Sequence, residues 1–165
     1  PRGFGEVKAE GDTVRAGTAA LDGVCTIWQA DGRERTTAVA DFVTSDRQNV
    51  LSSGDLLRQI DIPLSALKRR SAFRQISLTP IGRSAALLIG TVGEGEFALT
   101  MTASTIRPIR LSFAGIPRED ELRNAILQCI PDALYHTDVH GTPMWRKHMT
   151  LRLAEEIRAE LQAQP

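Results

Sequence analysis

The sequence has few cysteines and no long hydrophobic run, and each absence excludes a class of protein. Its 165 residues include only two cysteines, Cys25 and Cys129, which form no CxxC pair. This excludes the disulfide framework of small secreted domains and the four-cysteine set of a two-iron cluster. No apolar run reaches the roughly 18 to 20 residues that span a bilayer, and no signal peptide opens the chain. We therefore expect a cytoplasmic protein with no membrane segment and with both thiols reduced and buried.

The chain also lacks a net charge, because 20 basic residues balance 20 acidic ones. A balanced charge produces no general field that would attract nucleic acid or an anionic membrane. We therefore expect no nucleic-acid partner, and a phosphate ligand would need a local cluster of donors.

The first part of the chain favours β-strands. Residues 24–30, VCTIWQA, are rich in β-branched and aromatic side chains, and the following DGRER supplies a turn into a second strand. Residues 54–63 alternate between two faces, which puts Leu56 and Leu57 on opposite sides until Pro63 removes a backbone donor. We predict a hairpin followed by a strand that ends at Pro63.

Three further strands are predicted in residues 85–92, 97–104 and 105–114, with a tight GEGE turn between the first two. This arrangement is an antiparallel meander. The second strand alternates between an apolar face and a face of small or polar residues, so we expect helices on one side and a wetter surface on the other. The apolar positions are Phe97, Leu99 and Met101.

Two helices are predicted after the meander. The first opens at Pro117, has acids in its first turn and stops before Pro131, and the second has Thr142 as N-cap and Pro143 at its first position. The expected buried side chains are Leu122, Ile126, Leu127 and Ile130 in the first helix, and Trp145, Met149, Leu153, Ile157 and Leu161 in the second. The fold class is therefore α+β.

Few residues suggest chemistry on their own. His136, Asp138 and His140 would share a face in an extended segment and resemble a zinc or iron set, but the stretch reads as a surface loop, so we expect no metal. His148 lies on a helix flank, which favours solvent over catalysis. The GEGE glycines lack the third glycine and the strand-to-helix context of a dinucleotide loop, so a hairpin explains them.

Arg74, in SAFRQ, has three interpretations: a surface ion pair, a fork that binds backbone carbonyls, or an anchor for a ligand oxygen or phosphate. From the residues alone the surface ion pair is favoured.

The order of these blocks resembles the flavoprotein subunit or domain of the molybdenum hydroxylases, the xanthine dehydrogenase and aerobic carbon monoxide dehydrogenase family. There a strand of the type G/E-x-L-x-x-I-x-I-P precedes an aromatic and a basic residue that open the next strand, as GDLLRQIDIP precedes SAFRQ here. Upstream, AALDGVCTIW is similar to the family's A-L-D-A strand. Downstream, GTPMWRKHMTLRLAEEI resembles its closing helix.

The resemblance implies that Leu57 packs near the flavin ring of FAD. Arg74 stands where the family usually places a Lys that reaches FAD, and Asp12 would match an acidic FAD contact. It also implies a division into residues 1–68, part of a central β-rich FAD-binding subdomain, and residues 69–165, a C-terminal subdomain with the three-stranded meander.

The family's Gly-rich A-G-G loop, which binds the FAD pyrophosphate, is missing, and the chain starts at Pro1 without an initiator Met. We therefore expect the second half of a flavoprotein, which by itself binds FAD weakly or not at all.

The implied function is electron transfer from iron–sulfur clusters through FAD to an acceptor, beside a molybdopterin-binding large subunit and an iron–sulfur small subunit. The alternative is a non-catalytic interaction module that docks a partner without a cofactor of its own, because no self-sufficient catalytic constellation is present.

Overall fold

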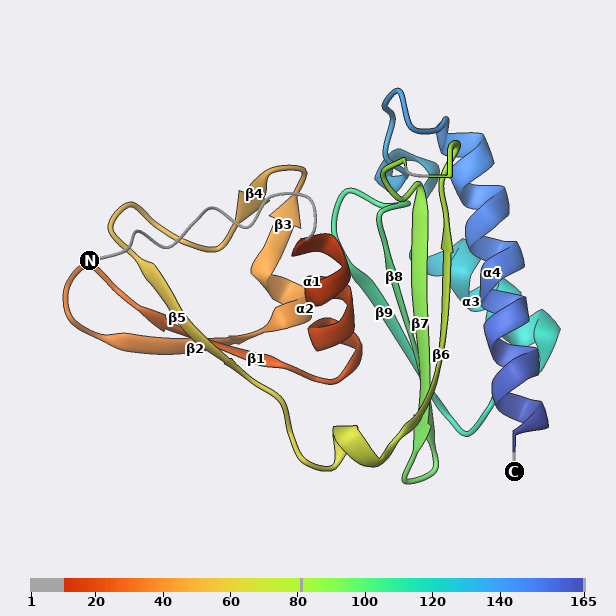
Figure 1. Cartoon of the computed structure of the whole chain (residues 1–165), viewed down its shortest axis with the longest axis horizontal. Helices are drawn as coiled ribbons and strands as arrows, with labels where there is room; N and C mark the ends of the chain where they lie inside the picture. Colours follow the sequence, from red (N-terminus) through yellow and green to blue (C-terminus); the bar gives the residue numbers. More distant parts are fainter. Residues whose placement is uncertain (1–10, 81, 165) are drawn as a thin grey trace.

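The chain folds into two main antiparallel β-sheets with helices packed on them, which makes it an α+β protein (Figure 1). A computed structural model describes residues 11–80 and 82–164, with residues 11–15 described by their backbone alone. Helix α1 (Gly11–Ala20) lies between the two sheets, and helix α4 (Pro143–Ala163) covers the outer face of the larger one. Within the described ranges, no helix is both long and apolar enough to cross a membrane.

The smaller sheet has the strand order β2-β1-β5, and its first two strands form the predicted hairpin. Its strands are β1 (Val24–Trp28), β2 (Glu34–Ala38) and β5 (Leu56–Asp61). The alternation predicted for β5 is wrong, because a bulge at Arg58 puts two residues opposite one of β1. Leu57 and Ile60 consequently both pack against a small core formed by Ala19, Cys25 and Val39.

A short helix and a hairpin follow β2 before the chain returns to β5. They are α2 (Val39–Phe42), β3 (Val43–Ser45) and β4 (Gln48–Asn49). The turn between the two strands consists of Asp46 and Arg47, and Arg47 has a φ of 54°, in the left-handed region. Residues 62–69, which include the 3₁₀ turn η1 (Ala66–Lys68), then lead to the larger sheet.

The larger sheet has four strands in the order β6-β7-β8-β9, one more than the predicted meander. They are β6 (Arg70–Ile76), β7 (Ala86–Gly93), β8 (Glu96–Thr102) and β9 (Ile109–Ala114). SAFRQ forms the added edge strand. The GEGE hairpin is confirmed, since Glu94 and Gly95 both have positive φ. The last strand begins at Ile109 and not at 105, because the chain turns at Ala103 and Thr105 pairs with Tyr135.

The two C-terminal helices cover one face of this sheet. Thr142 caps α4 as predicted, with its Oγ1 accepting the backbone N–H of Trp145 at 3.3 Å. Helix α3 (Glu119–Cys129) begins two residues after Pro117 and ends before Pro131, where the 3₁₀ turn η2 (Asp132–Leu134) follows. The main core between sheet and helices contains the side chains of Phe97, Leu99, Met101, Leu122, Ile126, Ile130, Met149, Leu153, Ile157 and Leu161.

Two predicted core positions of α3 are wrong. Leu127 is 37% exposed, and Cys129 is exposed as well. Leu122, Ile126 and Ile130 recur every four residues and take up the narrow stripe that faces the core, so positions 127 and 129 fall outside it. Cys25 is buried as expected, and burial raises the pKa of its thiol.

Helix α1 was not predicted, and it corrects the expectation that the second face of the larger sheet is wet. It packs across β7 and β8, whose side chains on this face include the buried Thr91 and Thr100. Its own buried residues are Ala16, Ala19 and Ala20, and such small side chains allow a close approach of helix and sheet. The stretch AALDG, which the family resemblance places in a strand, therefore begins with the last two residues of α1 and continues into the turn before β1.

An ion cluster also joins the two parts of the chain. Asp22, which follows α1, lies 2.7 Å from the Arg69 guanidinium and 2.8 Å from that of Arg110. Glu96 contacts the same two arginines at 3.7 and 3.4 Å. These partly buried side chains hold the residues that follow α1 against one end of the larger sheet.

Tyr135 carries a buried hydroxyl that has no hydrogen-bond partner among the described residues. Burial, and then the nearby Asp132 carboxylate, raise its pKa to about 12. Since this value exceeds the ordinary value of about 10, titration of Tyr135 costs no stability below about pH 10, and the fold loses stability as the pH rises from about 10 towards about 12.

We predict that Tyr135→Phe leaves the free energy of unfolding at neutral pH unchanged or raises it by up to about 1 kcal/mol, because it removes an unpaired polar group. Urea unfolding at neutral and alkaline pH measures the effect, and the variant should lose less stability at alkaline pH than the parent. Tyr135 is the only tyrosine, so tyrosinate absorbance follows its titration directly. A clear loss of stability at neutral pH would show that the hydroxyl has a partner.

Candidate functional site

A cavity of about 210 Å³ lies between the β3–β4 hairpin and one end of the larger sheet. The β3–β4 turn and Ala16 of α1 form one side of it. The other side comes from the loops at the upper end of β7 and β8 in Figure 1 and from the segment before α4. The charged and ionisable residues of its wall are Asp46, Arg47, Arg83, Arg107, His136, Asp138 and Arg146.

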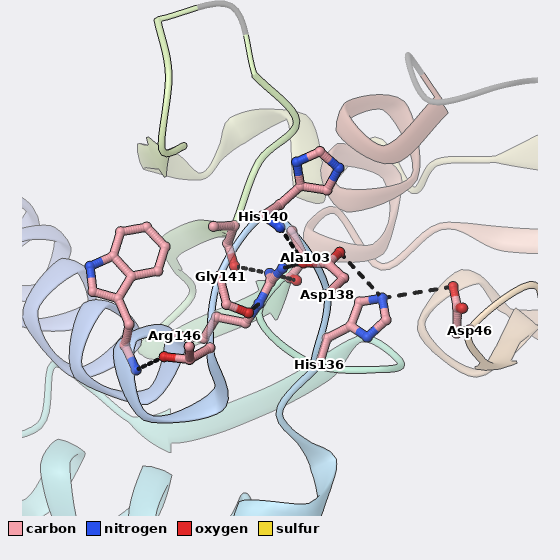
Figure 2. A network of polar contacts seen from close by, with 10 residues as sticks. Asp46, Ala103, His136, Asp138, His140, Gly141 and Arg146 are labelled. Carbon is pink, nitrogen blue, oxygen red and sulfur yellow. Dashed lines mark hydrogen bonds and ion pairs between the residues drawn. The ribbon is translucent and has the colours of Figure 1, made fainter.

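Arg146 is the most buried of these side chains, with 1% of its surface exposed. One terminal nitrogen donates to the carbonyl oxygens of Ala85 and Ala103 at 2.5 and 2.7 Å, and Nε donates to that of Gly141 at 3.2 Å. The other terminal nitrogen donates to the Asp138 carboxylate at 2.5 Å (Figure 2). One guanidinium from α4 therefore fixes the start of β7, the end of β8 and the loop that precedes the helix.

Asp138 is held from two sides. Its Oδ1 accepts the backbone N–H of His140 at 2.8 Å as well as the Arg146 contact. Burial by itself raises the pKa of Asp138, but these two donors and the nearby His136 outweigh it, so the pKa lies below its ordinary value. The carboxylate is therefore charged at neutral pH and balances Arg146.

His136 lies between two carboxylates that come from different parts of the chain. Its Nε2 is 3.7 Å from Oδ2 of Asp138 and 4.0 Å from Oδ1 of Asp46 in the β3–β4 turn. The ring of His140 points away from both (Figure 2). The three side chains considered for a metal are thus not directed at one point, and among residues 11–80 and 82–164 no group of three metal-ligating side chains is found. His148 is exposed on α4, as expected.

Arg74 makes the ion pair that its residue type favours. Its Nε donates to Glu156 at 3.2 Å and a terminal nitrogen donates to Glu160 at 2.6 Å, both on α4. The other terminal nitrogen donates to the Phe73 carbonyl at 2.9 Å. The hydrogen bond to Glu160 is the main reason why the pKa of Arg74 is raised.

The residues that the resemblance assigned to FAD are not gathered in the cavity. Leu57 packs on the small core and Arg74 pairs with α4, and neither belongs to the cavity wall. Asp12 lies in the first turn of α1, and its side chain is outside the described part. Their roles toward a flavin stay predictions.

Sequence reasoning missed the arginines of the cavity. Arg47, Arg83 and Arg107 lie in three separate loops with no common spacing, and each alone reads as an ordinary surface charge. Arg146 was overlooked because a basic residue in an amphipathic helix is usually solvated. The left-handed φ of Arg47 also marks this residue, but that feature is visible only in the structure.

Comparison with known proteins gives structural matches only. The sequence matches no protein-family profile, and no curated protein sequence is recognisably similar to it. The fold is similar to that of a reconstituted CO dehydrogenase from Oligotropha carboxidovorans, with a TM-score of 0.73 and 16% identity over 95% of this chain and 59% of the other.

Two further structures give the same result. Carbon monoxide dehydrogenase from Hydrogenophaga pseudoflava has a TM-score of 0.70 and 15% identity over 90% of this chain and 55% of the other. Quinoline 2-oxidoreductase from Pseudomonas putida 86 has a TM-score of 0.66 and 14% identity over 89% of this chain and 54% of the other. At these identities the similarity shows a shared fold, and the chain spans little more than half the length of these proteins.

Proposed function

We propose that the chain corresponds to the second half of the FAD-binding subunit of a molybdenum-dependent hydroxylase or dehydrogenase. The intact protein would pass electrons from iron–sulfur clusters through FAD to an acceptor. The observation that carries the proposal is the fold similarity to three such oxidoreductases over 89 to 95% of this chain. The order of sequence blocks around GDLLRQIDIP and SAFRQ points to the same family independently.

The described residues do not by themselves form a complete site for FAD. The cavity of about 210 Å³ is smaller than the roughly 300 to 1,000 Å³ of pockets that enclose ligands of drug size, and FAD is larger still. Leu57 and Arg74 are engaged in separate contacts. A dinucleotide needs many donors directed at its phosphates, so the remainder of the subunit would have to supply them.

The proposed partners are a molybdopterin-binding large subunit and an iron–sulfur small subunit, in the cytoplasm. When bound, FAD would supply the electron chemistry, and the protein would bind and orient it.

The alternative is an interaction module without a cofactor of its own. One observation favours it: the segment that joins the two sheets exposes apolar side chains, with Leu64 78% and Leu67 61% exposed. Exposed apolar residues close together in a connector are typical of a contact surface. A flavin in the full-length protein would decide against this alternative.

The full-length gene product, produced together with its neighbouring subunits, should purify with the visible absorbance of oxidised flavin. Arg74→Ala in that protein should weaken FAD binding about tenfold, the loss expected for one charged hydrogen bond. The isolated 165-residue chain should bind FAD weakly or not at all. Fluorescence titration with FAD measures both quantities.

Glu160→Gln is the matched control, because it removes the closer of the two carboxylates that pair with Arg74 but keeps the guanidinium. An anchoring role predicts that FAD binding survives in Glu160→Gln and weakens in Arg74→Ala. If FAD binding is the same in both variants and in the parent, Arg74 serves only the ion pair. A full-length protein that purifies without flavin would contradict the proposed function itself.

A further inference from the structure

The cavity has an excess of positive charge. Four arginines and two aspartates form its wall, which gives a net charge of +2 with His136 neutral. Arg146 and Asp138 neutralise each other, and Asp46 faces His136. Arg83 has an interaction of its own, so the excess belongs to Arg47 and Arg107, which come from both parts of the chain.

Two of these guanidinium groups have no partner within the part of the chain that the structure describes. Arg47 and Arg107 line the cavity, yet neither side chain makes a hydrogen bond or ion pair with a described residue. By contrast, Arg35, Arg58, Arg69, Arg74 and Arg110 all pair with carboxylates. Arg47 and Arg107 thus offer unpaired guanidinium donors at the cavity.

The backbone positions both arginines. Arg47 adopts a φ of 54° in the two-residue β3–β4 turn, a left-handed conformation that L side chains rarely adopt. The turn of Arg107 is fixed by the Thr105 hydroxyl, which donates to the Arg107 carbonyl at 2.7 Å. The hydroxyl-bearing Ser45 and Ser84 line the same space and can add neutral donors.

The size of the cavity limits the ligand. About 210 Å³ equals the space of roughly seven water molecules at about 30 Å³ each. This holds a phosphate group with part of its substituent and excludes a whole dinucleotide. A cation is disfavoured by the net charge, and Asp138 already accepts from Arg146 and His140.

We infer that this cavity binds a small phosphate dianion, either inorganic phosphate or the phosphate group of a monoester, between Arg47 and Arg107. Guanidinium groups match phosphate oxygens with paired N–H donors. A phosphate bound by both side chains would connect the β3–β4 turn, which carries Arg47, with the β8–β9 loop, which carries Arg107. The site goes beyond the proposed flavin function and does not depend on it.

Isothermal titration of the full-length protein with inorganic phosphate, and separately with glycerol phosphate, tests this inference at constant ionic strength. We expect saturable binding that weakens about tenfold in Arg47→Asn and in Arg107→Gln. Asparagine is used at position 47 because it tolerates positive φ, so the turn is preserved. Unchanged thermal unfolding without phosphate verifies that each variant is folded.

Arg33→Gln is the matched control, since this exposed arginine pairs with Asp31 in the β1–β2 turn, outside the cavity wall. Phosphate binding by this variant should equal that of the parent. Binding of inorganic phosphate alone identifies the free ion as ligand, and equal or tighter binding of glycerol phosphate identifies a monoester. The inference is overturned if phosphate does not bind saturably, or if Arg33→Gln weakens binding as much as the two cavity variants. Neither result depends on whether the protein carries flavin.

Discussion

Replacing Arg146 with alanine should lower the free energy of unfolding by about 3 to 5 kcal/mol, the usual cost of removing one partner of a buried ion pair. The substitution leaves the Asp138 carboxylate without its cation. It also leaves the carbonyls of Ala85, Ala103 and Gly141 without their donor. Arg146→Lys should recover little of this loss, because an ammonium group cannot reach partners on three segments at once. Urea unfolding monitored by circular dichroism measures the effect.

Arg152→Ala is the control for this result. Arg152 lies on the same helix, but its side chain is 65% exposed and pairs with Glu156 at 3.1 Å. Its removal should cost no more than about 0.5 kcal/mol. If Arg146→Ala lost as little as Arg152→Ala, the network around Arg146 would not hold the strands together.

Gly90→Ala should be the second most damaging substitution, with a loss of about 2 to 3 kcal/mol. Gly90 lies on β7 directly beneath α4, and a Cβ atom there would overlap Cγ2 of Ile157 and come within 3.0 Å of Cδ1 of Leu161. Both neighbours are fully buried, so they cannot move aside without displacing the helix. Thermal and urea unfolding would show the loss.

Gly17→Ala provides a control of opposite sign. Gly17 lies in α1, and an added Cβ atom there meets no atom within 4 Å. The substitution should raise the free energy of unfolding by about 0.5 to 1 kcal/mol, since alanine favours the helix. In an Ile157→Ala background, Gly90→Ala should cost at least 1 kcal/mol less than in the parent, because the methyl group then has space. Equal costs in both backgrounds would contradict a steric origin.

The predictions that succeeded rest on interactions between residues close in sequence. Thr142 and Pro143 start α4 because a hydroxyl cap and a fixed φ act within one turn. The GEGE turn and the hairpin of β1 and β2 likewise depend on a few adjacent residues. The α+β class and the order of the blocks followed from these local signals.

The predictions that failed depend on partners distant in sequence. The bulge at Arg58 arises from pairing with β1, and it reversed the side on which Ile60 packs. The second face of the larger sheet is dry because α1, whose apolar face consists largely of alanine, covers it. Small residues give a weak periodic signal, so neither the helix nor its covering role could be read from the sequence.

From the sequence we could predict the β1–β2 hairpin, the GEGE turn, the start of α4 and the stop of α3 before Pro131, and the residue type of Arg74 favoured its ion pair. Which arginines are buried or line the cavity depends on the tertiary structure. Arg47, Arg107 and Arg146 carry the same charge in the sequence, yet one is enclosed by carbonyls from three segments and two face the cavity. A side chain's charge is local, but its desolvation and its partners depend on what the fold brings around it.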